Sequence, residues 1–173
     1  MFKNAYFAGG CFWCTESIFQ RVKGVSLVIP GYMGGYIKNP SYHEVCSGRT
    51  GHTETIKITY DKNIISYSQL LEFFFLTHDP TKLNRQGNDV GTQYRSAVFF
   101  ENQSEKKQIL ESISIFEKKK IYNESFVTEI NKKIEFYDAE TEHHDYYNQN
   151  KSQSYCQLVI RPKIKKFENL LNK

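Results

Sequence analysis

The chain reads AYFAGGCFWCTE over residues 5–16. The apolar run at 5–8 predicts a short buried strand, the two glycines permit a tight turn, and the apolar spacing that follows predicts an amphipathic helix. Cys11 therefore lies where a strand ends and a helix begins. The free N–H groups of a helix N-terminus stabilise an anion, so we expect the pKa of the Cys11 thiol to fall from about 8.5 to roughly 3.5–7.5. This makes Cys11 a candidate nucleophile, and the alternative is that Cys11 and Cys14 are small buried apolar residues.

Length and composition indicate one globular domain. The 173 residues are 39% hydrophobic and 15% aromatic, enough for a sizeable core. The net charge of +4 is scattered along the chain, which argues against nucleic acid as a partner. No secretory signal or membrane-spanning run is visible, so we expect no membrane association and a cytoplasmic location. In that reducing compartment, the four cysteines predict thiol chemistry rather than a disulfide scaffold.

Strand and helix patterns alternate along the chain. Alternation of apolar residues predicts a strand over 53–60, and helical spacing after Ser66 or Ser68 places Phe74 and Phe75 in the core. The segments 126–130 and 134–137 predict strands of a hairpin. We therefore expect a mixed α/β or α+β sandwich. Residues 1–173 would form a single catalytic domain. We expect its C-terminal segment, 148–173, to be mobile because residues 148–154 contain no apolar side chain.

Two glycine-containing loops, residues 38–52 and 78–93, place polar side chains near strand ends. Glu54 follows the first loop, and a carboxyl group beside an aromatic pocket has a raised pKa and can donate a proton. Tyr42 and Tyr94 can hydrogen-bond a substrate oxygen, and Asp89 can accept a backbone N–H of a bound peptide. Each residue also has a structural alternative. Glu54 could be a solvated charge at a strand end, the two tyrosines could belong to the core or the surface, and Asp89 could serve only to form a turn.

The residues beside Cys11 allow other uses of the thiols. Phe12 and Trp13 can form an apolar wall next to the nucleophile. A Cys-x-x-Cys motif at a strand-to-helix turn is also typical of thioredoxin-like thiol oxidoreductases, but no proline here opens a later strand. A zinc site would use Cys11, Cys14 and Cys46 with Cys156 or His52. Structural zinc usually takes two close ligand pairs, which this spacing lacks, so we expect no metal.

Three motifs together resemble the A-type peptide methionine sulfoxide reductases. They are GCFWCTE at 10–16, Tyr42 with VCSGRTGHTE at 45–54, and QGNDVGTQYRS at 86–96. The resemblance covers nearly the whole chain and implies an α+β fold, a two-layer α/β sandwich with a mixed sheet, a ferredoxin-like core and long functional loops. It implies reduction of methionine S-sulfoxide, free or in proteins, as a repair of oxidative damage.

The resemblance also implies residue roles. Cys11 matches the nucleophile that becomes a sulfenic acid, Glu54 the acid, Tyr42 and Tyr94 its helpers, Asp89 the residue that orients the substrate, and Phe12 with Trp13 the methyl pocket. Thioredoxin, or another external dithiol, would be the reductant, with no cofactor.

The thiol that resolves the sulfenic acid stays open at this point. Cys14 lies one helical turn from Cys11, and Cys156 matches a C-terminal recycling cysteine, so the two could act in relay. We expect Cys46 to be structural and the protein to be a monomer. Around His143 and in residues 148–154 the chain departs from the family pattern. The function alternative is a thiol-based redox sensor, which would not need the proton donor Glu54.

Overall fold

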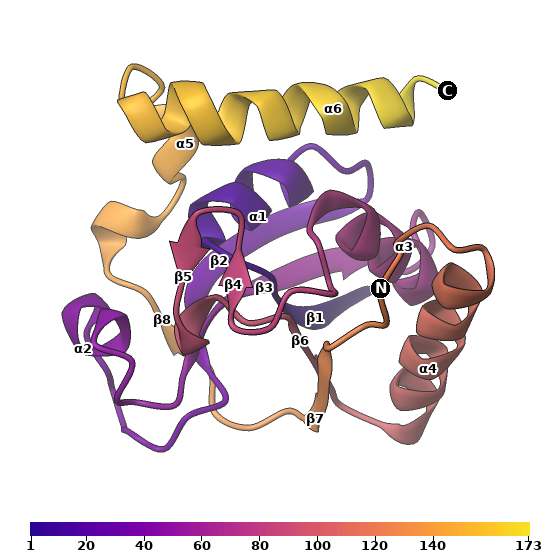
Figure 1. Ribbon diagram of the computed structural model, residues 1–173, viewed down its shortest axis with the longest axis horizontal. Helices are drawn as coiled ribbons and strands as arrows, with labels where there is room; N and C mark the ends of the chain where they lie inside the picture. The colour runs from indigo at the N-terminus through magenta and orange to yellow at the C-terminus, as the bar shows by residue number, and fades with distance from the viewer.

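A computed structural model describes all 173 residues, and its main element is a six-stranded sheet (Figure 1). The strands are β1 (Phe2–Ala8), β2 (Val25–Met33), β3 (Thr53–Asp61), β6 (Ala97–Phe100), β7 (Glu129–Lys132) and β8 (Tyr137–Asp138), with β4 (Arg85–Gln86) and β5 (Asp89–Val90) forming a separate two-stranded ribbon. The helices are α1 (Phe12–Phe19), α2 (Tyr42–Cys46), α3 (Tyr67–Thr77), α4 (Gln103–Lys118), α5 (Tyr146–Gln149) and α6 (Arg161–Leu171). Short 3-10 turns η1 (Thr92–Tyr94) and η2 (Thr141–His143) and the π-helical segment η3 (Cys156–Ile160) complete the chain.

The strand order is β7-β6-β1-β3-β2-β8, and only the β6–β7 pair is parallel. Helix α1 connects β1 to β2, and α3 connects β3 to β6, so the four central strands follow the β-α-β-β-α-β pattern of ferredoxin-like folds. The predicted α+β class with a mixed sheet is confirmed.

The two faces of the sheet are buried differently. Phe7 and Ile58 point to the face covered by α1 and α3 and belong to a cluster of 24 buried residues. Tyr6, one position away, points to the opposite face and packs in a much smaller cluster with Met33 and Phe99. This split follows from the two-residue period of a strand, which the alternation at 53–60 had indicated.

Phe74 of α3 lies at the centre of the larger cluster, with no exposed surface and its ring 4.8 Å from that of Phe7. We expect Phe74→Ala to lower the free energy of unfolding by about 3–5 kcal/mol, because the vacated space cannot be refilled by neighbours on a rigid sheet. Denaturant unfolding measures this. The control is Phe2→Ala, since Phe2 is 61% exposed and its loss should cost less than about 1 kcal/mol. Equal losses in the two variants would contradict this account of the core.

The predicted hairpin at 126–137 is wrong. Strand β7 pairs with β6, whereas β8 pairs with β2 at the opposite edge of the sheet. The chain between them crosses the sheet's less covered face, where the Phe136 ring packs 5.7 Å from that of Tyr6. β8 can approach β2 closely because Gly31 has no side chain; a Cβ there would lie 2.4 Å from the Tyr137 carbonyl oxygen. Burial of Phe136 therefore outweighs the local turn.

The C-terminal segment lies across α1 (Figure 1). Phe167 of α6 is buried in the main core, and Ile160 and Ile164 pack beside Cys11 and Cys14. The mobility expected for residues 148–173 stays a prediction. None of the helices combines the length and apolar character that a membrane crossing requires.

Candidate active site

Cys11 is the N-cap residue of α1, at the turn that follows β1, as its sequence position predicted. Gly10 adopts a φ of +84°, and its N–H donates to the Tyr94 carbonyl oxygen at 3.2 Å. A Cβ at Gly10 would lie 2.8 Å from the Gln86 side chain, so only glycine fits here without displacement. This close approach brings the loop that carries Tyr94 against the Cys11 turn.

Glu54 lies at the start of β3, fully buried beside the same turn. Its Oε1 accepts a hydrogen bond from the Phe12 backbone N–H at 3.0 Å, while its Oε2 has no partner. Burial raises the pKa of Glu54 to about 8, despite the opposing effect of the Phe12 hydrogen bond. Near neutral pH the group is therefore a protonated carboxylic acid with one oxygen that has no hydrogen-bond partner. The upward shift of its pKa agrees with the prediction from the sequence.

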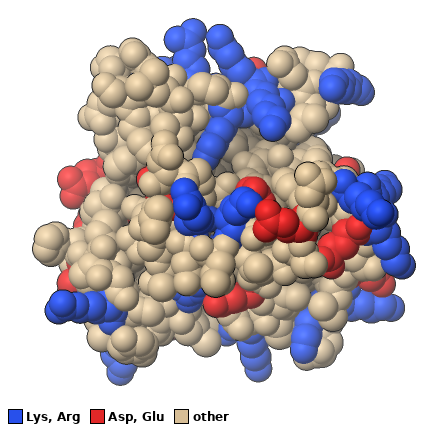
Figure 2. All heavy atoms as spheres, viewed as in Figure 1, with Lys and Arg blue, Asp and Glu red and all other residues tan.

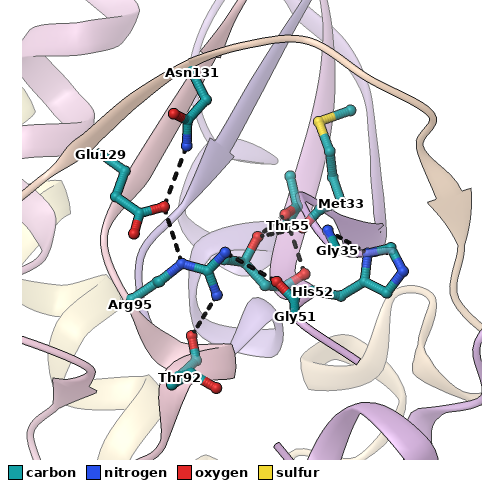
Figure 3. A network of polar contacts seen from close by, with 10 residues as sticks. Met33, Gly35, Gly51, His52, Thr55, Thr92, Arg95, Glu129 and Asn131 are labelled. Atoms are coloured by element: carbon teal, nitrogen blue, oxygen red, sulfur yellow. Dashed lines mark hydrogen bonds and ion pairs between the residues drawn. The ribbon is translucent and has the colours of Figure 1, made fainter. Parts of the chain in front are cut away.

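Arg95 holds the loop before Glu54 in place (Figure 3). Its guanidinium donates to the Gly51 carbonyl oxygen at 3.0 Å and to the Thr92 carbonyl oxygen at 2.9 Å, and it pairs with Glu129 at 3.1 Å. These contacts join the two predicted loops and β7. The loops are thus fixed relative to each other by one planar side chain with several donors.

Tyr42 and Tyr94 both lie near enough to Glu54 for a charge on its carboxyl group to act on their hydroxyls. Burial raises the pKa of each phenol, and a negative charge on Glu54 raises it further, so both hydroxyls stay protonated donors. The backbone N–H of Tyr42 donates to Glu140 at 2.8 Å, and Glu140 also accepts from the Tyr32 hydroxyl at 2.9 Å. Glu140 thereby anchors the start of α2, a role that the sequence did not suggest.

An aromatic group lies beside the nucleophile. Phe12 is fully buried, whereas the half-buried Trp13 ring stacks on Tyr146 with the ring centres 3.8 Å apart. The Trp13 indole N–H donates to Nδ1 of His143 at 3.2 Å, and the His143 ring lies 4.3 Å from that of Tyr42. Burial lowers the pKa of His143, which keeps it neutral and able to accept this bond. The sequence predicted a wall of Phe12 and Trp13 beside Cys11 but did not predict that His143 and Tyr146 pack against it.

Glu16 fixes the segment that carries Tyr146. Its carboxyl group accepts the backbone N–H groups of Asp145 at 2.9 Å and Tyr146 at 3.3 Å. Burial raises the pKa of Glu16 to about 7. A buried side chain of α1 thus orders the start of α5, and with it the ring stacked on Trp13.

We expect Glu16→Ala to lower the free energy of unfolding by about 2–4 kcal/mol, because two backbone donors lose their acceptor. Trp13 is the only tryptophan, so its fluorescence reports the same change as a red shift of emission when Tyr146 moves away. The exposed Glu72→Ala serves as the control and should leave both signals in place. An unchanged emission in Glu16→Ala would show that Glu16 does not order this wall.

Asp89 is not free in this structure. Its Oδ2 accepts a hydrogen bond from the Tyr155 hydroxyl at 2.7 Å. The Tyr155 oxygen also lies 3.7 Å from the Cys14 sulfur, and its ring packs edge-on against Trp13. The residue before Cys156 thus reaches into the site, which no local sequence pattern indicated.

Three of the four free thiols lie together. Cys11, Cys14 and Cys156 are buried in one apolar cluster. Cys156, the C-terminal cysteine, enters this cluster from η3. Cys46 is half-buried at the end of α2, one helical turn after Tyr42. The structure therefore brings both candidate resolving thiols to Cys11 and leaves Cys46 apart from them.

The expected lowering of the Cys11 pKa is wrong. Burial raises the pKa of the Cys11 thiol well above its ordinary value, and a hydrogen bond to Cys14 and the charge of Glu54 act in the same direction. The helix terminus is outweighed because the sulfur is shielded from water. The same hydrogen bond lowers the pKa of Cys14 to about 7, against burial and together with the charge of Lys163. Of the two thiols, Cys14 therefore loses its proton first.

The amino-acid sequence was compared with known families and proteins, and it matches one family over nearly its whole length. The family described as peptide methionine sulfoxide reductase matches residues 3–173. Peptide methionine sulfoxide reductase MsrA of Saccharolobus solfataricus is 52% identical over 166 residues, which cover 96% of this chain and 93% of the relative.

Solved structures agree with the sequence comparison. The reduced form of Mxr1 from Saccharomyces cerevisiae matches with a TM-score of 0.84 and 32% identity, covering 90% of this chain and 89% of that chain. Methionine sulfoxide reductase A of Corynebacterium diphtheriae matches with a TM-score of 0.77 and 33% identity, covering 86% and 75%. The match therefore extends over the fold that carries the site.

Proposed function

Because the chain belongs to the peptide methionine sulfoxide reductase family and reduces methionine sulfoxide, we propose that the Cys11 thiol and the Glu54 carboxyl group are its reaction centre. The observation that carries this proposal is the buried, unpartnered Oε2 of a protonated Glu54, held by the residue next to Cys11. A sulfoxide oxygen leaves readily only when it is protonated, and this acid is placed to protonate it.

In the proposed first step, the Cys11 sulfur attacks the sulfoxide sulfur as Glu54 gives its proton to the sulfoxide oxygen, and the Glu54 carboxylate then takes up the proton that the Cys11 thiol loses. The sulfoxide S–O bond breaks, the oxygen passes to Cys11 as a sulfenic acid, and methionine leaves with its sulfur reduced. The hydroxyls of Tyr42 and Tyr94 donate to the same oxygen while its charge builds up. The S epimer is the expected substrate, as the family resemblance implies.

Substrate binding would use the aromatic wall and Asp89. The Trp13 ring, backed by the buried Phe12, packs against the methyl group of the sulfoxide. A backbone N–H of a peptide substrate takes the position on Asp89 that the Tyr155 hydroxyl now holds. Binding of a peptide and release of Tyr155 are then linked, since one carboxylate oxygen serves both.

Recycling would run through the clustered thiols. Cys14 condenses with the sulfenic acid, which releases water and forms a disulfide, and Cys156 can then take over that bond. A dithiol protein of the thioredoxin type reduces the final disulfide, and no cofactor takes part. We propose a monomeric single domain that works in a reducing, cytoplasmic compartment, which four free thiols favour.

The test is a reaction without added reductant. Pre-reduced protein is mixed with excess methionine S-sulfoxide, and methionine and disulfides are quantified in the same quenched sample. We expect about one methionine per chain if the bridge stays on Cys11, and about two if Cys156 takes it over and frees Cys11. No methionine together with four free thiols would overturn the proposal.

A further inference from the structure

We propose that Lys163 is a positioning residue that holds Cys14 as the thiolate, so that Cys14 rather than Cys156 attacks oxidised Cys11. This inference rests on the proposed function, because it concerns the step after methionine has left. It gives a residue of α6 a role in the reaction, although α6 lies outside the three sequence motifs.

The contact between the two residues carries the inference. The Lys163 Nζ lies 3.8 Å from the Cys14 sulfur, in the first turn of a helix that crosses over α1 (Figure 1). Cys14 is only 2% exposed and packs in one cluster with the apolar side chains of Ile160 and Ile164. A charge on such a sulfur needs a partner, because burial alone disfavours it.

Lys163 has no competing partner. It forms none of the ion pairs in the structure, although it is half-buried. Positive side chains gather over α6 in Figure 2, and their heads lie in solvent like that of the exposed Lys165. Lys163 differs from these lysines because its ammonium group reaches the buried sulfur.

The other groups that face the Cys14 sulfur cannot replace this cation. They are the Cys11 thiol, the Glu54 and Asp89 carboxyl groups, the Tyr155 hydroxyl and the Cys156 thiol. The Tyr155 hydroxyl also lowers the pKa of Cys14, but its effect is smaller than that of the Lys163 charge, and its single proton is engaged in the 2.7 Å bond to Asp89. The hydrogen bond from the Cys11 thiol is the largest influence that lowers the pKa of Cys14, but that thiol is consumed when Cys11 is oxidised. The Lys163 charge remains at the moment when Cys14 must attack.

The step balances with the groups already present. The Cys14 thiolate attacks the sulfenic sulfur of Cys11, an S–S bond forms and the S–O bond breaks. The Cys14 sulfur is oxidised, the sulfenic sulfur is reduced, and the hydroxide leaves as water with a proton from solvent. Cys156 lacks such a cation, and burial raises the pKa of its thiol. It therefore remains protonated at neutral pH and enters only by exchange with the first disulfide.

The experiment follows one turnover of pre-reduced protein by rapid quench, in Lys163→Gln, Lys163→Arg and the control Lys165→Gln. Methionine release is measured beside the decay of the sulfenic acid, trapped with a dimedone reagent, and the appearance of the Cys11–Cys14 disulfide by mass spectrometry. Methionine release in the unsubstituted protein checks the proposed function separately. Circular dichroism verifies that each variant is folded.

We expect Lys163→Gln to slow disulfide formation roughly 3- to 10-fold at pH 7, more than it slows methionine release, and to move the pH midpoint of that step upward by about one unit. Lys163→Arg should restore the midpoint, and Lys165→Gln should match the unsubstituted protein. A purely structural role for Lys163 would change the yield but not the midpoint. The proposal is overturned if Lys163→Gln keeps the midpoint, or if the first disulfide joins Cys11 to Cys156.

Discussion

Replacing Cys11 with serine is expected to lower the rate of methionine formation by roughly 10⁴-fold or more, to the level of the uncatalysed reaction. A serine hydroxyl stays protonated at physiological pH and cannot accept the sulfoxide oxygen as a sulfenic acid does. The substitution keeps a similar side-chain shape at the N-cap of α1, where serine is a favoured residue, so the fold should persist.

Methionine release with a chemical reductant present measures this effect, because the reductant removes any dependence on the resolving thiols. The comparison is Cys46→Ser, which changes a thiol outside the buried cluster and should stay within about tenfold of the unsubstituted rate. If Cys11→Ser retained turnover while Cys46→Ser lost it, the nucleophile would have been assigned to the wrong loop.

The features that the sequence predicted are those with a local cause. The two-residue alternation at 53–60 and the helical spacing around Phe74 each follow from burial of one face, and the structure buries those faces. The placement of Cys11 at a strand-to-helix turn depends on two adjacent glycines. No distant contact is needed for any of these predictions.

The features that the sequence missed depend on contacts across the fold. His143, Tyr155 and Lys163 reach the site from segments more than 120 residues after α1, and no local sequence pattern places them beside Cys11 or Cys14. The direction in which the pKa of Cys11 shifts was predicted wrongly for a related reason. The helix terminus can be seen in the sequence, whereas the shielding by Ile160 and its neighbours arises only when η3 and α6 pack on α1.

Glu54→Gln is expected to lower the rate of methionine formation by roughly 10²–10⁴-fold, the usual contribution of a positioned proton donor. The amide has nearly the same shape and can still accept the Phe12 N–H, but it cannot protonate the sulfoxide oxygen. Substrate affinity should change much less, since the aromatic wall is untouched. Single-turnover methionine release measures the rate, and the exposed Glu72→Gln should match the unsubstituted protein.

The same substitution should change the pH dependence of stability. Burial raises the pKa of Glu54 from 4.5 to about 8, so between these values the folded state binds more protons than the unfolded state. Stability that is present below pH 4.5 is therefore lost as the pH rises towards 8. An amide at this position does not titrate in either state. Glu54→Gln should therefore be more stable than the parent by about 1–3 kcal/mol at pH 8, and the difference should shrink towards pH 5.

Denaturant unfolding of the parent and of Glu54→Gln from pH 5 to 8 measures, for each protein, the slope of the free energy of unfolding against pH. A residual slope of the same sign should remain in Glu54→Gln, because burial also raises the pKa of Glu16 to about 7. Loss of activity together with a gain of stability would mean that the fold tolerates a destabilising acid because the chemistry requires it. Parallel slopes would instead show that Glu54 is ionised in the folded protein near pH 7, and the proton for the sulfoxide oxygen would have to come from Tyr42 or Tyr94.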